Sequence, residues 1–128
     1  LQKFDIRQMS KVDVTASVRK SEPNTLCVRI GGPTRIKTGF NDKVSLLPFV
    51  DKVTGELMLI RAEKHQQDHP SARKAYKKSS NSIYMTIPLN AVLKGFFPGV
   101  CAHDLTLVEA SADKIIVKLP KIKDVSNG

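Results

Sequence analysis

The chain has 128 residues, of which 41% are hydrophobic, so it can bury one sizeable core but is too short for two independent domains. Its 21 Lys and Arg residues outnumber 12 Asp and Glu residues, and the net charge of +9 favours polyanionic partners such as nucleic acid or an acidic protein. No stretch approaches the roughly 20 apolar residues of a membrane span, and the first residues lack the apolar segment of a signal peptide. These features predict a single domain over residues 1–128, a cytoplasmic location and no membrane partner.

Alternating side chains predict the first two strands. Residues 12–18 place β-branched side chains on one side, as in a half-buried strand. Residues 26–30 alternate in the same way, with Cys27 and Arg29 between apolar neighbours, and the two runs are expected to pair. The two glycines and the proline at 31–33 predict a loop or one helical turn, because each glycine makes a regular helix costlier by about 1 kcal/mol than alanine does.

A hairpin is predicted next. Residues 43–50 form a third apolar run, in which Pro48 indicates an edge position or a bulge because proline cannot donate a ladder hydrogen bond. Residues 51–55 have the composition of a tight turn, and residues 56–61 are expected to return as a strand.

The segment 64–81 carries the highest density of positive charge. It holds five cations against the single acid Asp68, which accounts for +4 of the net +9: Lys64, Arg73, Lys74, Lys77 and Lys78. Because the segment lacks apolar periodicity and contains Pro70, we expect an exposed connector with a helical turn over residues 71–78. Its lysines can serve a solvated linker that maintains solubility, or a loop that contacts phosphates.

The second half begins with a strand and a short helix. Residues 83–87 alternate between two faces, and Pro88 ends the strand while serving as an acceptable first residue of a helix. The helix is expected over residues 89–93, and Gly95 is expected to end it.

A second hairpin, with strands at 104–108 and 114–119, makes units 24–62 and 81–120 alike in order. The first strands align at an offset of 57 residues: Leu26, Val28 and Ile30 fall on Ile83, Met85 and Ile87. The closing strands align at an offset of 58 residues: Leu57 and Leu59 fall on Ile115 and Val117. Since one such unit cannot enclose a core, two copies predict one mainly β, barrel-like domain with one or two short helices.

The second unit resembles the swapped-hairpin unit of AbrB-like transition-state regulators. The shared pattern is a strand ending in Ile-Pro, a short helix ending near Leu-Gly and a closing hairpin, and residues 81–96 read NSIYMTIPLNAVLKGF here. The first unit is similar through residues 39–47 and 54–61. Two tandem units in one chain resemble the MraZ arrangement, which implies that both halves build one small barrel.

The resemblance implies DNA binding, because AbrB-like proteins contact DNA through basic side chains before and within the first strand of each unit. The matching positions before the second unit are Arg73, Lys74, Lys77 and Lys78. Those before the first unit are Arg19 and Lys20, and the second basic patch also includes Arg35 and Lys37. The expected function is that of a DNA-binding regulator of transcription or of a mobile element, acting on duplex phosphates as a homo-oligomer.

Base reading would need bidentate donors, for which the arginines are the candidates: Arg29, Arg35, Arg61 and Arg73. Arg29 has a second interpretation, as an outward strand residue without a partner. Only 5% of the residues are aromatic, and the rings in or near the basic segment are Tyr76 and Tyr84. Because stacking platforms for single strands use several rings, duplex binding is favoured over single-strand binding.

A protein-interaction module is the alternative function. An antitoxin-type or phage-type inhibitor of this size would dock its positive face on an acidic protein surface. The two functions are distinguished by whether the two basic patches lie on one continuous face, as DNA binding requires.

Catalytic and metal sites are not predicted. His65 and His69 have the i,i+4 spacing of helical metal ligands, but no cysteine or glutamate lies at a useful spacing and Pro70 follows directly. His103 and Asp104 are adjacent at a strand start, so their side chains are expected on opposite faces. The sequence therefore predicts a protein that is not an enzyme and that uses no metal or cofactor.

Overall fold

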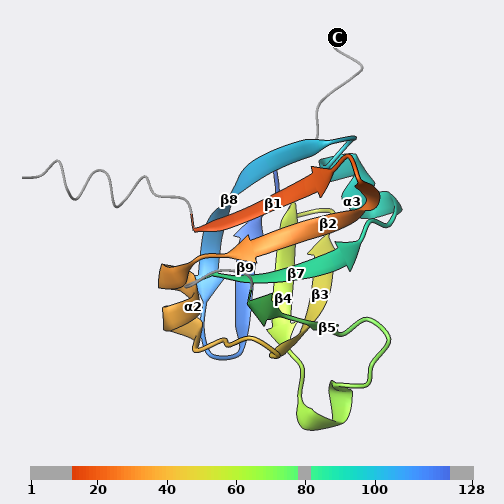
Figure 1. Cartoon of the computed structure of the whole chain (residues 1–128). Coiled ribbons are helices and arrows are strands. Elements are labelled where there is room, and N and C mark those ends of the chain that lie inside the picture. Colours follow the sequence, from red (N-terminus) through yellow and green to blue (C-terminus); the bar gives the residue numbers. More distant parts are fainter. Residues whose placement is uncertain (1–12, 78–81, 122–128) are drawn as a thin grey trace, which may run out of the picture.

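The structure is a computed structural model that describes residues 13–77 and 82–121. Within these residues, nine strands form one sheet that curls into a nearly closed barrel, with a short helix toward each end (Figure 1). The strands are β1 (Val14–Arg19), β2 (Glu22–Ile30), β3 (Ser45–Asp51), β4 (Glu56–Arg61), β5 (Arg73–Lys74), β6 (Tyr76–Lys77), β7 (Ile83–Pro88), β8 (Cys101–Ala110) and β9 (Lys114–Lys118). The helices are α2 (Gly32–Thr38), α3 (Ala91–Phe96) and the single 3-10 turn η1 (Lys64–Gln66). The prediction of a mainly β, barrel-like fold with short helices is confirmed.

The barrel closes through one short segment of the chain. The sheet runs in the order β5-β3-β4-β9-β8-β1-β2-β7-β6, so its two edge strands are consecutive in sequence and are joined by Ala75. β5 pairs with β3 through Arg73 opposite Leu46, and β6 pairs with β7 through Tyr76 opposite Tyr84. Ala75 is buried, and its backbone forms hydrogen bonds with the residues just before β3. Residues 73–77, here called the closing segment, therefore join the two edges of the sheet.

The closing segment corrects a prediction. Residues 64–72 are mostly exposed and contain only η1, but the helical turn expected over residues 71–78 is wrong, because residues 73–77 are extended and paired. The edges of β3 and β7 would otherwise present unpaired backbone N–H and C=O groups, which this segment satisfies. Residues 78–81, the end of the expected connector, lie outside the described residues.

The barrel interior holds one apolar cluster that draws on both halves of the chain. Alternate residues of the long strands point inward, and Val28 on β2, Met85 on β7 and Leu59 on β4 are fully buried. Phe40, just after α2, and Phe97, just after α3, add the two largest buried side chains. The residues between these inward positions therefore form the outer surface of the sheet.

The two halves share an element order, and their strands cross in register. Each half runs strand, helix, hairpin, as β2-α2-β3-β4 and as β7-α3-β8-β9. The β2–β7 pair places Leu26 opposite Ile87, Val28 opposite Met85 and Ile30 opposite Ile83. The β4–β9 pair places Leu57 opposite Val117, Met58 opposite Ile116 and Leu59 opposite Ile115. An approximate two-fold axis between the halves would produce these registers, because positions that align in sequence exchange partners across it.

A regular helix follows β2, where the sequence predicts only a loop or one turn. The helix begins after Gly31, carries proline in its first turn, and ends at Gly39, which adopts the left-handed conformation with φ of 75°. The carboxylate of Asp13 accepts a hydrogen bond from the backbone N–H of Thr34 at 2.6 Å and another from its hydroxyl. The prediction is wrong because this cap lies 21 residues away in the chain, where no local pattern reveals it.

The second helix starts later than its sequence predicts. Asn90 is the N-cap, and its side-chain oxygen accepts a hydrogen bond from the backbone N–H of Leu93 at 2.8 Å. Pro88 is the last residue of β7 rather than the first of a helix, and Gly95 lies within α3 rather than ending it. The cap decides the boundary because it satisfies a backbone N–H that a proline start would leave unpaired.

Both hairpins form as predicted. β3 and β4 meet in a turn at which Gly55 has a φ of 69°, and β8 and β9 meet at residues 111–113. Pro48 lies in the part of β3 that pairs with β4 alone among the described strands, as expected of an edge position. β8 is longer than predicted, because it begins at Cys101 and pairs with β1 before it pairs with β9.

Candidate nucleic-acid interface

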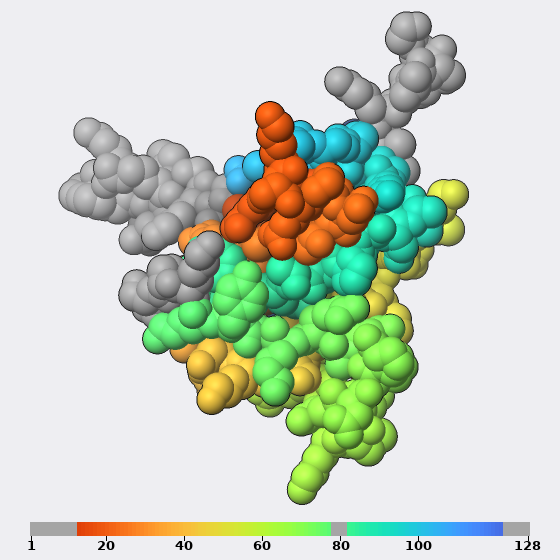
Figure 2. Space-filling model, turned by 45° about the vertical axis from the view of Figure 1, so that its right-hand side comes forward, coloured from red at the N-terminus to blue at the C-terminus, as the bar shows by residue number. Residues whose placement is uncertain are grey.

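One side of the barrel is polar and basic. On β1, β2 and β7, buried residues alternate with residues that point outward, and directly opposite residues of paired strands share a side. The outward residues of these strands and of the closing segment form what we call the basic face: Thr15, Ser17 and Arg19 on β1, Cys27 and Arg29 on β2, Tyr84 and Thr86 on β7, Lys74 on β5 and Tyr76 on β6. Lys74 lies at the border of this face, because β5 pairs it with Ser45 on β3. Figure 2 shows the red-to-orange β1–β2 hairpin, teal β7 and the green closing segment on one side of the molecule.

An arginine and two tyrosines form a row across the middle of the basic face. Arg29 lies directly opposite Tyr84, which lies directly opposite Tyr76 on the next strand. The two tyrosine rings are stacked, with centroids 5.9 Å apart and planes inclined by 23°. Tyr76 is 41% exposed, so one ring of the pair is accessible to a ligand beside a guanidinium group.

Tyr76 interacts with the residues near the β1–β2 turn. Burial is the largest cause that raises the pKa of Tyr76 above its ordinary value; Cys27 and Glu22 also raise it, and Arg19 lowers it. Arg19 in turn donates a hydrogen bond from Nη2 to the Sγ of Cys27 at 3.9 Å. The Tyr76 hydroxyl is therefore protonated at neutral pH and can donate a hydrogen bond to an anion.

The cations of the basic face are not neutralised by neighbouring acids. Among the described residues, the one ion pair joins Lys114 to Glu109 at 3.9 Å, and it lies at the β8–β9 hairpin rather than on this face. Two carboxylates lie at its margins, namely Glu22, opposite Arg19, and Asp104, opposite Thr15 on β8. No described carboxylate lies within 4.0 Å of the cationic groups of Arg19, Arg29 or Lys74.

The first predicted basic patch is divided by the sheet. Lys74 is exposed on the basic face, and Lys77 is exposed opposite Ile83, at the end of the sheet where β2 leads into α2. Arg73 instead leaves β5 on the inner side, toward the barrel end that holds α3. Lys78 lies outside the described residues, so two members of this patch remain as candidate phosphate contacts.

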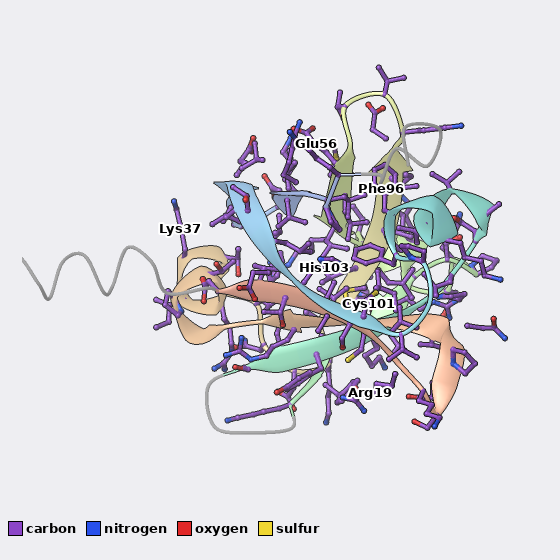
Figure 3. All side chains as sticks on the ribbon, turned by 90° about the horizontal axis from the view of Figure 1, so that it is seen from above. Arg19, Lys37, Glu56, Phe96, Cys101 and His103 are labelled. Atoms are coloured by element: carbon purple, nitrogen blue, oxygen red, sulfur yellow. The ribbon has the colours of Figure 1, made fainter. Side chains whose placement is uncertain are left out.

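The second predicted patch is not one patch in the structure. Arg19 and Lys20 lie at the β1–β2 turn, whereas Arg35 and Lys37 lie on α2 beyond the other end of β2. Figure 3 shows Lys37 at the left-hand end of the barrel and Arg19 well away from it on the lower side. Arg35 also donates from Nε to the backbone carbonyl of Phe40 at 3.1 Å, which stabilises the turn after α2. Of this patch, only Arg19 therefore belongs to the basic face, and Lys20 is exposed beside it in the turn.

The sheet also adds residues that were not assigned to the site from the sequence. Arg29, Tyr76 and Tyr84 form the central row of the basic face. The sequence alone leaves Arg29 with two interpretations and indicates only that the two tyrosines lie in or near the basic segment. The alternating pattern of β2 predicts that Arg29 points outward, since its neighbours on either side point inward. The tyrosines could not be paired from sequence, because β6 was not predicted.

The remaining titratable residues form no second chemical centre in the part of the chain that the structure describes. His103 packs its ring edge-on against Phe97 at 5.8 Å, while Asp104 is exposed on the outer side, so this pair diverges as predicted. His69 accepts a hydrogen bond from the backbone N–H of Ser71 at 3.0 Å. No group of three His, Cys, Asp or Glu residues is placed to hold a metal ion within residues 13–77 and 82–121.

No helix within the described ranges is long and apolar enough to cross a membrane. No protein-family model, curated protein or solved structure matches the chain. The function is therefore inferred from the chemistry of the basic face and from the sequence resemblance.

Proposed function

We propose that this protein binds duplex DNA through the basic face. The observation that carries the proposal is the set of cations on one sheet surface, Arg19, Arg29 and Lys74, none of which has a described carboxylate within 4.0 Å. Phosphates would supply the missing negative charge, and the hydroxyls of Thr15 and Ser17 on the same surface can donate further hydrogen bonds to them. The exposed ring of Tyr76 adds a surface for a sugar or a base.

We further propose that the two halves are AbrB-like swapped-hairpin units, spanning residues 24–62 and 81–120. The shared order of strand, helix and hairpin supports this proposal, and so do the crossed registers of β2 with β7 and of β4 with β9. A helix in the first half strengthens the likeness of the two units beyond what the sequence predicts. On this basis the protein is a cytoplasmic regulator of transcription or of a mobile element.

Phosphate contact should dominate the affinity for DNA. Each neutralised phosphate releases counterions, so the logarithm of the binding constant falls with the logarithm of salt concentration by about 0.9 per contact. Arg29 is the candidate for reading a guanine edge, because it lies in the centre of the face and its guanidinium can form two parallel hydrogen bonds. The stacked pair offers few rings for successive bases, which favours duplex over single-stranded DNA.

A charge-matched pair of variants tests the proposal. The first variant combines Arg19→Ala, Arg29→Ala and Lys74→Ala on the basic face. The second combines the same loss of charge at exposed sites elsewhere: Lys52→Ala, Lys64→Ala and Lys118→Ala. Fluorescence anisotropy with a labelled duplex, between about 50 and 200 mM salt, should show a salt slope lower by roughly 2–3 in the first variant only. Equal losses in both variants would show that affinity follows net charge and would overturn the assignment to this face.

Protein contact is the second candidate function, and a different surface favours it. Five outward residues of β3, β4 and β9 are apolar and form what we call the apolar face: Leu47, Phe49, Met58, Ile60 and Ile116. Leu47 and Ile116 are largely buried, and the charged residues Glu56 and Lys118 lie at the margin of this face. Phe49 is 52% exposed, and a shallow cavity of about 470 Å³ lies beside Met58 and Ile60. Exposed apolar surface of this kind marks interaction sites. We propose a second copy of this chain as its partner, since an isologous contact needs only one self-complementary patch.

A further inference from the structure

A cavity of about 220 Å³ opens at the barrel end that holds α3. Its walls are apolar where the ends of β3, β4 and β7 meet the helix, through Val50, Leu57, Ile87 and Leu93. Polar groups enter it from Ser71, Arg73 and Asn90. The cavity thus combines an apolar lining with a few polar groups, which is the usual composition of a small-molecule site.

Arg73 is turned into this cavity by the register of the closing segment. It lies directly opposite Leu46, whose side chain is fully buried, so the Arg73 side chain leaves β5 on the inner side of the sheet. Its Nε atom is buried and has no hydrogen-bond partner in the part of the chain that the structure describes. No described carboxylate lies within 4.0 Å of its guanidinium. Buried donors of this kind are nearly always paired, so this one indicates an absent acceptor.

The other polar groups of the cavity are also donors. The side-chain oxygen of Asn90 already accepts the hydrogen bond that caps α3, which leaves its NH₂ group to donate. Ser71 contributes a hydroxyl, and no acidic side chain lines the cavity. Three donors that surround an apolar space therefore select a ligand with negative charge at one end.

We infer that this cavity binds a small organic anion, a carboxylate or phosphate on a compact apolar body. The planar guanidinium of Arg73 matches two oxygens of such a group, and the apolar walls match the body of the ligand. The volume of about 220 Å³ equals that of roughly seven water molecules, so the body is limited to one ring or a short alkyl chain. This site is separate from the basic face and does not depend on DNA binding.

Three probes of one shape test the inference on the full chain: phenylacetate, phenyl phosphate and the neutral phenylacetamide. The readout is the Nε–Hε resonance of Arg73 in ¹H–¹⁵N spectra, because this group gains the acceptor. We expect saturable shifts with a Kd below about 1 mM for at least one anion, and binding of the amide at least tenfold weaker. The stronger of the two anions identifies the carboxylate or the phosphate as the preferred group.

Two variants and a control complete the test. Arg73→Gln removes the charge in the cavity, and Asn90→Asp keeps an N-cap for α3 but adds a carboxylate beside Arg73. Each variant should weaken anion binding at least tenfold. Binding to the variants is measured through the amide signals of Leu93. Lys74→Gln removes the same charge from the outer surface and should change the anion affinity less than twofold. The inference is overturned if no anion saturates the site, if the amide binds equally well, or if a folded Arg73→Gln protein retains the affinity.

Discussion

The basic face and the apolar face lie on opposite sides of one barrel and have opposite chemistry. Seen from above, Arg19 lies on the side of the basic face, and Glu56, the first residue of β4, lies on the side of the apolar face (Figure 3). Outward residues of β1, β2 and β7 include hydroxyls, tyrosine, cysteine and arginine, whereas those in the middle of β3, β4 and β9 are aliphatic or aromatic and charged residues stand toward the strand ends. The backbones are alike, because each sheet half is built around one antiparallel pair that joins the two halves of the chain.

The crossed registers determine the barrel fold but do not determine the chemistry of its outer surface. At the centre of the β2–β7 pair, Val28 and Met85 point inward and are fully buried. At the centre of the β4–β9 pair, Met58 and Ile116 point outward. The chemical difference between the two faces thus depends on single outward side chains rather than on the fold.

The largest effect should come from the shared core beneath the two faces. Met85→Ala lies under the basic face and Leu59→Ala lies under the apolar face, and both side chains are fully buried. Each should lower the free energy of unfolding by about 2–5 kcal/mol, because each leaves a cavity between close-packed strands. Urea denaturation followed by circular dichroism measures both values. A loss below about 1 kcal/mol for either variant would show that its half of the sheet is not packed as described.

A lysine introduced on the apolar face should weaken self-association of the chain, whereas a lysine introduced on the basic face should not. Met58→Lys places an ammonium group in the centre of the apolar face, and Thr15→Lys makes the same change on the basic face. We expect Met58→Lys to weaken self-association at least about tenfold, since burying an unpaired charge is costly. Sedimentation velocity over a range of concentrations measures this constant. Equal association of wild type and Met58→Lys would exclude this face as the contact between copies.

Tyrosine emission can report on the basic face alone. The chain has two tyrosines and no tryptophan, so Tyr84→Phe leaves Tyr76 as the only strong emitter. Duplex DNA bound at this face should change the Tyr76 emission with the same midpoint as the anisotropy signal. Added phosphates should also raise the Tyr76 pKa further, because they disfavour the phenolate. Saturated DNA binding without any change in emission would place the DNA on another surface.

The smallest effect concerns the turn between β3 and β4. Backbone N–H groups of Thr54 and Val53 donate to the Asp51 carboxylate and hold its pKa below the ordinary value. A depressed folded-state pKa contributes stability above the unfolded-state pKa of about 3.9, and that contribution is lost as pH falls through the folded-state value. Asp51→Ala should therefore lower Tm slightly at neutral pH, and the difference should disappear in acid. A difference that persists in acid would assign the effect to packing.

Much of the sheet could be predicted from the sequence, because alternation and turn composition are local signals. The strand at residues 56–61 has the predicted bounds, and the offsets of 57 and 58 residues reappear as the crossed registers. The missed elements depend on distant residues. α2 depends on Asp13, the residue before β1, and β5 and β6 depend on the free edges of β3 and β7. Neither dependence leaves a pattern within the segment itself.

The candidate site could be predicted by residue type but not by arrangement. The sequence grouped Arg19 with Arg35 because both precede or follow the same strand, yet that strand separates them by its whole length. The resemblance groups Arg73 with Lys74 because both precede the strand at residues 83–87, yet adjacent residues of a strand point to opposite sides. Closure of the barrel decides which side of each strand faces outward. Closure depends on β5 and β6, which the sequence does not predict.

The closing segment has a consequence for how the barrel opens. It holds the two edges of the sheet with two paired residues on each side, whereas β2 pairs over most of its length with both neighbours. The barrel should open where the strand pairing is shortest. Amide hydrogens at residues 73–77 should therefore exchange with solvent through a local opening of lower free energy than the opening that exposes those of β2. That joint holds Arg73 on one side and Tyr76 on the other, so a ligand on either side that prefers the closed ring would slow exchange across the whole seam.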